Sequence, residues 1–138
     1  HENIVGVKDA TADLCMPTLV KAACGEEFIQ FSGEDGTALG FLAQGGHGVI
    51  SVTANLVPRL CSEFFKSWKA NDVLQAFERH MALMPLHDVM FVESNPIPVK
   101  FALSLMKRCI GEYRLPLCEP SKENSDLIES TMYKLQLL

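Results

Sequence analysis

The stretch that decides the fold spans residues 4–52 and reads IVGVKDATADLCMPTLVKAACGEEFIQFSGEDGTALGFLAQGGHGVISV. It contains three short apolar runs, at Ile4–Val7, Phe28–Phe31 and Val49–Val52. Runs of this length that are apolar on both faces are typical of strands buried in a parallel sheet. We therefore expect three buried strands.

Two helical patterns separate these strands. Residues 14–24 carry apolar side chains at helical spacing and stop before Gly25, and residues 37–44 are rich in Ala and Leu and stop before Gly45. Glycine is a common stop signal for a helix. The order β-α-β-α-β predicts an α/β fold with a parallel sheet and right-handed crossovers.

After Pro58 the pattern becomes helical throughout. The expected helices are one from Pro58 to about Ala70, a second capped by Asn71 or Asp72, a third from Asn95 to about Met106, and a fourth after Pro120.

The second of these helices carries an apolar stripe. Its members are Val73, Phe77, Met81 and Met84, which we expect to face the core. Pro85 should kink or end the helix.

The chain divides into residues 1–70, with the strands, and residues 71–138, which are helical. Three strands cannot close a barrel, which needs about eight, and an isolated parallel sheet leaves two edges unpaired. The chain opens at His1 without methionine and runs directly into a strand. We expect a fragment whose fold is unfinished on its N-terminal side.

Composition narrows the class of protein. Hydrophobic residues make up 48% and charged residues 21%, the balance of a globular protein. No apolar run approaches the ~20 residues that cross a bilayer, and the net charge of −5 offers no basic surface for nucleic acid or an acidic membrane. We expect a cytoplasmic protein that binds neither nucleic acid nor membrane.

The metal-binding residue types lack ligand spacing. The five cysteines include no C-x-x-C pair, and the four histidines include no H-E-x-x-H. Neither a disulfide framework nor a zinc site is indicated. We expect reduced thiols, no metal and no cofactor.

Lys8 is the residue with the clearest chemical potential. It ends the first strand and shares a face with Gly6, because strand side chains alternate. A lysine that points into the space beside a glycine loses hydration, which favours the neutral amine that can attack a carbonyl. The alternative is a lysine at a strand end that simply reaches solvent.

Three other segments fall where a parallel barrel keeps its site, at the carboxyl ends of strands. They are Ser32–Asp35, Gly45–Ser51 and Glu93–Pro98. Glycine after a strand lets a ligand approach the backbone, although ordinary turns use the same residues. His47 precedes its strand, so we expect a structural or solvated histidine at the opposite end from the chemistry.

Together these segments resemble one family. The motifs, in chain order, are GVKDA at residues 6–10, SGED at 32–35, GGHGVISVTAN at 45–55, MPLH at 84–87 and ESNPIPVK at 93–100. Their order and spacing resemble the dihydrodipicolinate synthase family, within the superfamily of pyruvate-dependent class I aldolases and N-acetylneuraminate lyases. The resemblance runs from His1 to Leu138.

The resemblance implies a fold and a reaction. The fold would be a (β/α)8 barrel followed by a C-terminal helical domain, with strands six to eight and that domain in this chain. Lys8 would form an imine with pyruvate, and the derived enamine would attack aspartate semialdehyde to give 4-hydroxy-tetrahydrodipicolinate for lysine biosynthesis. Ile50 would contact pyruvate through its backbone, Gly33 would line the pocket, and Asn95 would lie near the second substrate.

The resemblance also implies a partner. The family's proton-relay tyrosines, a neighbouring threonine and a carboxylate-binding arginine all precede the lysine strand, and none has a counterpart here. An N-terminal half-barrel must supply them, so we expect this chain to be inactive alone. The family further implies a homo-oligomer, either a tetramer or a dimer.

Three alternatives stay open. The first is an N-acetylneuraminate lyase or keto-deoxy-sugar acid aldolase, which would share Lys8 but use another second substrate. The second is a barrel enzyme that binds phosphate at Gly33 and Gly45–Gly48, against which the charges of Glu34 and Asp35 argue. The third is a non-catalytic fragment that only assembles with a partner.

Overall fold

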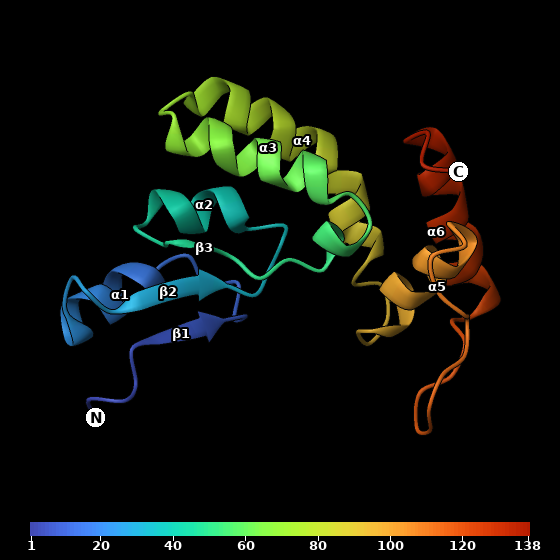
Figure 1. Cartoon of the computed structure of the whole chain (residues 1–138), viewed down its shortest axis with the longest axis horizontal. Coiled ribbons are helices and arrows are strands. Elements are labelled where there is room, and N and C mark those ends of the chain that lie inside the picture. Colours follow the sequence, from blue (N-terminus) through green and yellow to red (C-terminus); the bar gives the residue numbers. More distant parts are fainter.

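A parallel sheet forms the first half of the molecule. The computed structural model describes all 138 residues and has the strand order β1-β2-β3, with β1 at Gly6–Asp9, β2 at Ile29–Ser32 and β3 at Gly48–Val49. Helices α1 (Met16–Cys24) and α2 (Ala38–Ala43) connect them (Figure 1). Both strand pairs are parallel, so the predicted β-α-β-α-β order is confirmed.

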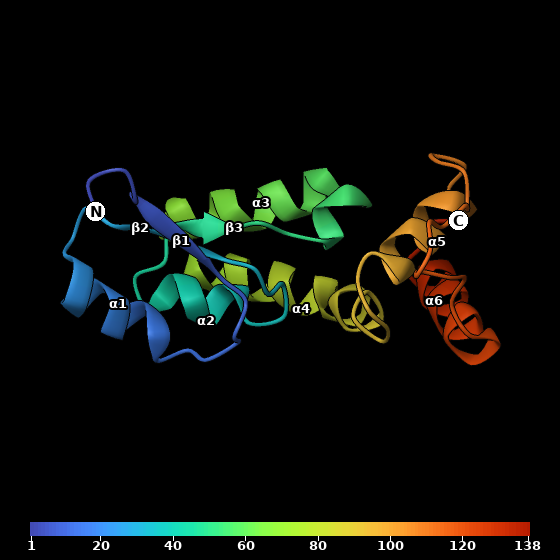
Figure 2. The same cartoon turned by 90° about the horizontal axis from the view of Figure 1, so that it is seen from below.

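The second half is helical, as predicted. Its elements are η1, a short 3-10 helix at Thr53–Asn55, α3 at Pro58–Lys69, α4 at Val73–Val89, α5 at Ile97–Leu105 and α6 at Lys122–Lys134. Helices α3 and α4 run side by side along the sheet layer, and α5 and α6 lie beyond the arrowheads of β1 and β2 (Figures 1 and 2). Helix α4 continues past Pro85.

The third strand is shorter than the predicted run Val49–Val52, since β3 contains only two residues. The amides of Val52 and Thr53 donate to the carboxylate of Asp35 at 2.8 and 3.2 Å, and not to a neighbouring strand. The backbone then enters η1. A side-chain acceptor therefore ends the strand earlier than its β-branched residues predict.

The two faces of β2 differ from the expectation that buried strands are apolar on both sides. Gln30 and Ser32 are each 1% exposed, and the amide nitrogen Nε2 of Gln30 donates to the carbonyl of Pro17 in α1 at 3.0 Å. Ile29 and Phe31 point to the other face and are 39% and 38% exposed. The prediction of two buried apolar faces is wrong for this chain, because helices cover only one of them.

One apolar core links the sheet half to the helical half. A cluster of 14 buried residues runs from Ala38 in α2 to Met132 in α6. Leu86, Ile128 and Met132 are almost completely inaccessible to solvent. Each such side chain contributes roughly 1.5–3 kcal/mol by its burial. The core therefore fixes how α4 to α6 sit against the sheet layer.

The stripe predicted on α4 does not face this core. Val73, Phe77 and Met81 are about half exposed, at 56%, 49% and 54%. The prediction that they pack inward is wrong for these three, whereas the fourth member, Met84, is half-buried.

The buried face of α4 lies beside that stripe. It carries Ala76, His80, Leu83 and His87, which recur at helical spacing. His80 contributes a polar anchor, because its Nε2 lies 3.1 Å from the carbonyl oxygen of Gly36 in the loop after β2. The polar contacts of His80 and His87 therefore help to turn this face of α4 inward. The apolar residues alone predict that the face with Val73, Phe77 and Met81 is the buried one.

Two leucines on α4 test this orientation. Leu86 is 1% exposed and Leu74 is 69% exposed. In the full polypeptide, Leu86→Ala should lower the free energy of unfolding by roughly 2–5 kcal/mol, because it removes packed atoms and leaves a cavity. Leu74→Ala, the matched control, should change it by less than about 0.5 kcal/mol. Guanidinium chloride denaturation measures both, and equal losses would contradict the orientation.

Candidate functional site at the strand ends

Backbone hydrogen bonds place the ends of the three strands side by side. The amide of Gly33 donates to the carbonyl of Asp9 at 2.6 Å, and the amide of Ile50 donates to the carbonyl of Ser32 at 2.8 Å. Lys8 directly precedes Asp9 in β1. Three of the four predicted site residues, Lys8, Gly33 and Ile50, therefore come from adjacent strand ends.

Gly33 and Lys8 are in direct contact. A Cβ atom at residue 33 would lie 2.8 Å from Cε of Lys8 and 2.8 Å from Cβ of Ala10. A side chain at residue 33 would clash with Ala10 and push the flexible end of Lys8 aside, so glycine leaves the lysine chain in place at this point. The structure thus gives Gly33 a physical role beside Lys8.

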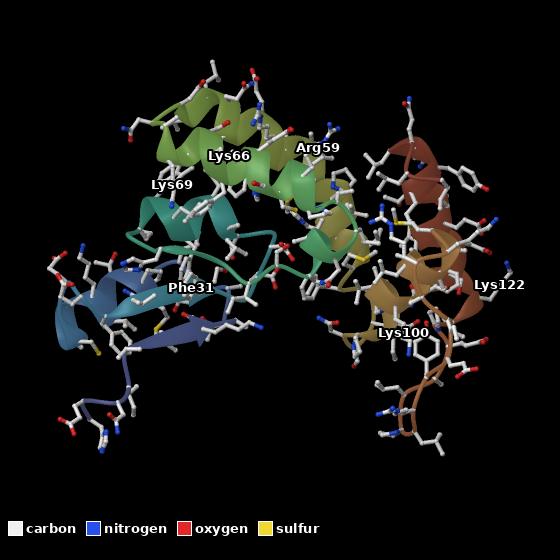
Figure 3. The ribbon with its side chains drawn as sticks, in the orientation of Figure 1. Phe31, Arg59, Lys66, Lys69, Lys100 and Lys122 are labelled. Carbon is white, nitrogen blue, oxygen red and sulfur yellow. The ribbon has the colours of Figure 1, made fainter.

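Lys8 is exposed to solvent in this structure. Of the two alternatives for this lysine, residues 1–138 show the one that reaches solvent. In the sheet, Lys8 is in register with Phe31 of β2, which is itself partly exposed on the same face (Figure 3). The amine is therefore free to meet a small molecule from this side.

Lys8 differs from every other lysine of the chain. It is the only lysine in a strand, whereas the others lie on helices or, for Lys107, directly after one (Figure 3). Lys21 pairs with Glu26 at 2.6 Å, and Lys122 pairs with Asp126. The absence of an ion pair is not what distinguishes Lys8, because five other lysines also have none: Lys66, Lys69, Lys100, Lys107 and Lys134.

Asn95 is not brought to the strand ends by any hydrogen bond. It is exposed, in the loop before α5. Its neighbour Glu93 is directed toward α6, where its carboxylate accepts from Asn124 Nδ2 at 2.7 Å and from the amide of Ser121 at 2.9 Å. These two donors lower the pKa of Glu93. This segment is anchored to α6 in this structure.

His47 has the structural role that its position predicts. Its amide donates to the carbonyl of Gln30 at 2.8 Å, and its Nδ1 accepts from the amide of Gln30 at 3.1 Å. It precedes β3, at the opposite end from Ile50. The ring extends the strand pairing of β2, which confirms that His47 is structural.

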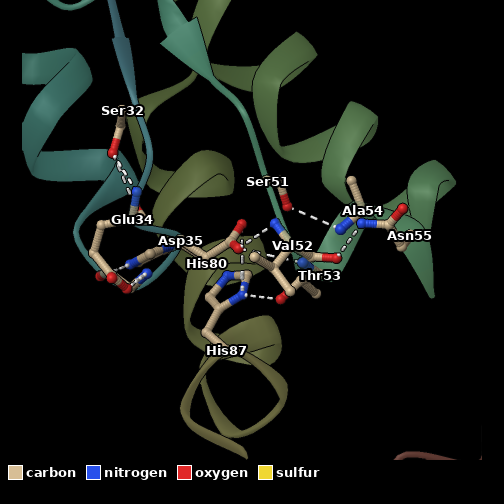
Figure 4. A network of polar contacts seen from close by, with 11 residues as sticks. Ser32, Glu34, Asp35, Ser51, Val52, Thr53, Ala54, Asn55, His80 and His87 are labelled. Carbon is tan, nitrogen blue, oxygen red and sulfur yellow. Dashed lines mark hydrogen bonds and ion pairs between the residues drawn. The ribbon is translucent and has the colours of Figure 1, made fainter. Parts of the chain in front are cut away.

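A buried carboxylate organises the backbone directly behind the strand ends (Figure 4). Asp35 is 3% exposed, and its Oδ2 accepts from the amides of both Val52 and Thr53. The same turn is closed by Ser51, whose hydroxyl accepts from the amide of Ala54 at 2.8 Å. Asp35 therefore joins the loop after β2 to the loop after β3.

Two buried histidines of α4 complete the network. His87 Nδ1 lies 2.8 Å from Oγ1 of Thr53 and 4.0 Å from Oδ1 of Asp35. Burial lowers the pKa of His87, and the nearby Asp35 opposes that shift. Burial also lowers the pKa of His80, whose Nδ1 has no hydrogen-bond partner. Both rings are therefore neutral at neutral pH.

A cavity of about 580 Å³ lies between β3 and α3. Phe31, Val49, Cys61 and Phe65 are among its lining residues, and Lys8 is not. Burial, with a smaller effect of Asp35, raises the pKa of the Cys61 thiol to about 11. Because the thiolate is the nucleophilic form, Cys61 is chemically inert at neutral pH. The cavity is an apolar space beside an unpaired strand edge, and Lys8 is not part of its lining.

The sequence placed Asp35 in a candidate segment, but it gave no role to Thr53 or His87 and did not predict that the three residues meet. All three lie inside the motifs SGED, GGHGVISVTAN and MPLH, but their meeting depends on contacts 17 to 34 residues apart. The available signal was a carboxylate soon after a strand-ending glycine, which can cap backbone amides of a neighbouring turn.

No helix of the structure has both the length and the apolar character to cross a bilayer.

Comparison with known proteins gives one consistent answer. The model of the dihydrodipicolinate synthetase family matches residues 1–135. The 4-hydroxy-tetrahydrodipicolinate synthase of Acidiphilium cryptum is 51% identical over 138 residues, which are 100% of this chain and 47% of that protein. The synthase of Bradyrhizobium diazoefficiens is 47% identical over 137 residues, 99% of this chain and 46% of that protein.

Solved structures agree. Dihydrodipicolinate synthase from Aquifex aeolicus superposes with a TM-score of 0.95 at 38% identity, over 99% of this chain and 46% of that one. The chloride-inhibited enzyme of Acinetobacter baumannii, solved in complex with pyruvate, gives a TM-score of 0.92 at 35% identity, over 99% of this chain and 47% of that one. The chain spans about half the length of these relatives. It belongs to the dihydrodipicolinate synthetase family.

Proposed function

We propose that the polypeptide carrying this chain condenses pyruvate with aspartate semialdehyde to 4-hydroxy-tetrahydrodipicolinate, a step of lysine and diaminopimelate biosynthesis, through an imine on Lys8. The observation that carries the proposal is the position of Lys8, the only lysine in a strand, in contact with Gly33 at adjacent strand ends. The pyruvate complex of the Acinetobacter relative and the names of the curated relatives support the substrate and the reaction.

The chemistry needs one primary amine with access to a ketone. The neutral Nζ of Lys8 adds to C2 of pyruvate, and protonation of the adduct's hydroxyl with loss of water gives the iminium. The iminium withdraws electrons from C3, which loses a proton and becomes the nucleophilic carbon of an enamine. That carbon bonds to the aldehyde carbon of aspartate semialdehyde, whose oxygen takes a proton and becomes the hydroxyl. The amino group of the same substrate then attacks the iminium carbon, which closes the ring of 4-hydroxy-tetrahydrodipicolinate and releases the free lysine. Neither a metal nor a cofactor enters this sequence of steps.

Backbone atoms of the neighbouring strand ends would orient the keto acid. The amide of Ile50 is used in the sheet, but its carbonyl oxygen receives no hydrogen bond from the chain. Gly33 leaves the backbone and the lysine chain open to a ligand. Asn95, from the loop before α5, would approach the second substrate once it is bound.

The barrel assignment belongs to the same proposal. Residues 1–70 would form strands six to eight of a (β/α)8 barrel and residues 71–138 its C-terminal helical domain. Neither β1 nor β3 has a second neighbour, and the apolar cavity beside β3 has room for further chain. A half-barrel from a preceding segment would pair with both edges, enclose Lys8 and supply the proton-relay groups. A cytoplasmic homo-oligomer, a dimer or a tetramer, would follow from the family.

The first test is whether residues 1–138 fold stably on their own. Two unpaired sheet edges and an uncovered sheet face should prevent these residues from folding stably by themselves. We expect the isolated chain to show no cooperative thermal transition as a monomer in circular dichroism. A sharp transition at monomeric molecular mass would contradict the need for a second half-barrel.

Lys8→Arg is the test of the covalent step. A guanidinium stays protonated and cannot add to a ketone, so the activity of the full polypeptide should fall by at least about 10³-fold. With pyruvate and borohydride, the parent should carry a single adduct on the peptide that contains Lys8. The variant should carry none.

Lys21→Arg is the matched control, because Lys21 is a helical lysine paired with Glu26. It should retain both the adduct and the activity. An adduct on another lysine, or normal turnover by a folded Lys8→Arg protein, would refute the proposal.

Gly33 and Ile50 should respond differently to substitution. Gly33→Val would clash with Ala10 and displace the end of Lys8 from its place at the strand ends, so we expect the pyruvate KM to rise about tenfold or more. Ile50→Val keeps the backbone and removes one methylene, so KM should change by less than about threefold. Steady-state kinetics compares the two variants, and similar KM values in both would remove Gly33 from the site.

A further inference from the structure

The loops after β2 and β3 are held together from behind by one carboxylate. Asp35 lies two residues after Gly33, and its amide partners, Val52 and Thr53, follow Ile50 by two and three residues. The carboxylate is 3% exposed, and it accepts hydrogen bonds from the amides of Val52 and Thr53. It therefore bridges two predicted substrate-contacting segments through the backbone (Figure 4).

We propose that Asp35 is a positioning residue, which fixes the backbone of residues 50–53 in the conformation that receives the carboxylate and ketone of a 2-keto acid. This inference rests on the proposed function, because it assigns Asp35 to the same site. Two consecutive amides converge on one oxygen of Asp35. Hydrogen bonds to a charged acceptor are roughly twice as strong as neutral ones, and a buried setting strengthens them further.

Helix α4 holds the carboxylate in place. The amide of Thr53 donates to Oδ2 of Asp35, and its hydroxyl oxygen Oγ1 lies 2.8 Å from Nδ1 of His87. Thr53 is 0% exposed and His87 is 4% exposed, so neither group can exchange its partner for water. His80, Asp88 and Asp35 are the charged or titratable groups that act on His87. The turn is thus clamped between the loop after β2 and the last turns of α4.

We call the hydrogen-bonded group of Asp35, Thr53 and His87 the clamp. It restrains Ile50 through the backbone that joins Ile50 to Val52. The amide of Ile50 is fixed to Ser32, and the amide of Val52 is fixed to Asp35. With both neighbours held, the peptide between Ile50 and Ser51 has little freedom, and its carbonyl presents one direction to a ligand. If Asp35 is lost, only the Ser32 end remains fixed. Binding of the keto acid should suffer more than the chemistry at Lys8.

Asp35→Asn in the full polypeptide tests the clamp, because it keeps the shape of the side chain and removes its charge. We expect the pyruvate KM to rise about tenfold while kcat changes by less than about threefold. Hydrogen exchange should become faster at the amides of Val52 and Thr53. Glu78→Gln, on the exposed side of α4, is the matched control and should leave KM and exchange at the parent values.

A second pair of variants keeps the test decisive if Asp35→Asn does not fold. Thr53→Val removes the hydroxyl contact with His87 and keeps the amide contact with Asp35, so KM should rise and exchange at residue 52 should accelerate. Thr53→Ser restores the hydroxyl and should recover most of both. A purely structural role predicts lower thermal stability with unchanged KM in every variant, and that result would overturn the inference.

The outcome also separates this inference from the proposed function. If the parent forms no pyruvate adduct at Lys8, the proposed function fails, and the role of the clamp in keto-acid binding fails with it. If the parent forms the adduct and Asp35→Asn keeps parental KM and exchange, only the positioning role of Asp35 is overturned.

Discussion

The parallel pairing of three strand ends is the constraint on which the rest of the structure depends. Asp9 accepts from Gly33, and Ser32 accepts from Ile50, so the chain after each strand emerges beside the previous one. Because of this pairing, Lys8 and Ile50 lie at the same end of the sheet, although they are 42 positions apart in the sequence. A parallel sheet gathers chemical groups in this way because all its carboxyl ends point the same way.

The strand ends have a buried side and an exposed side. Asp35, Thr53 and His87 are packed behind the strand ends and joined by hydrogen bonds, and one core continues from α2 to α6. On the other side, Lys8 and Phe31 face outward together. Rigid support behind a reactive amine favours precise placement of a ligand, since second-layer contacts limit how far binding atoms can move.

Much of the fold could be predicted from sequence, because periodicity reports local structure well. The three strands, their order and the helices after Pro58 follow from apolar runs, glycines and prolines. The face of α4 could not be predicted, because His80 and His87 face inward through polar contacts with residues distant in sequence. Similarly, β3 ends early because the carboxylate of Asp35 captures the amides of Val52 and Thr53.

The site was predicted unevenly for the same reason. Lys8 and Gly33 could be selected because they end strands and resemble family motifs, and the structure places them in contact. Asn95 is exposed and no hydrogen bond joins it to them, and the environment of Lys8 in the full polypeptide depends on residues outside this sequence. The most direct measurement is a crystal structure of the full polypeptide soaked with pyruvate and reduced by borohydride. Continuous density from Nζ of Lys8 to C2 of the former keto acid, with its carboxylate beside Gly33 and Ile50, is the predicted result; an unmodified Lys8 with density on another residue would contradict it.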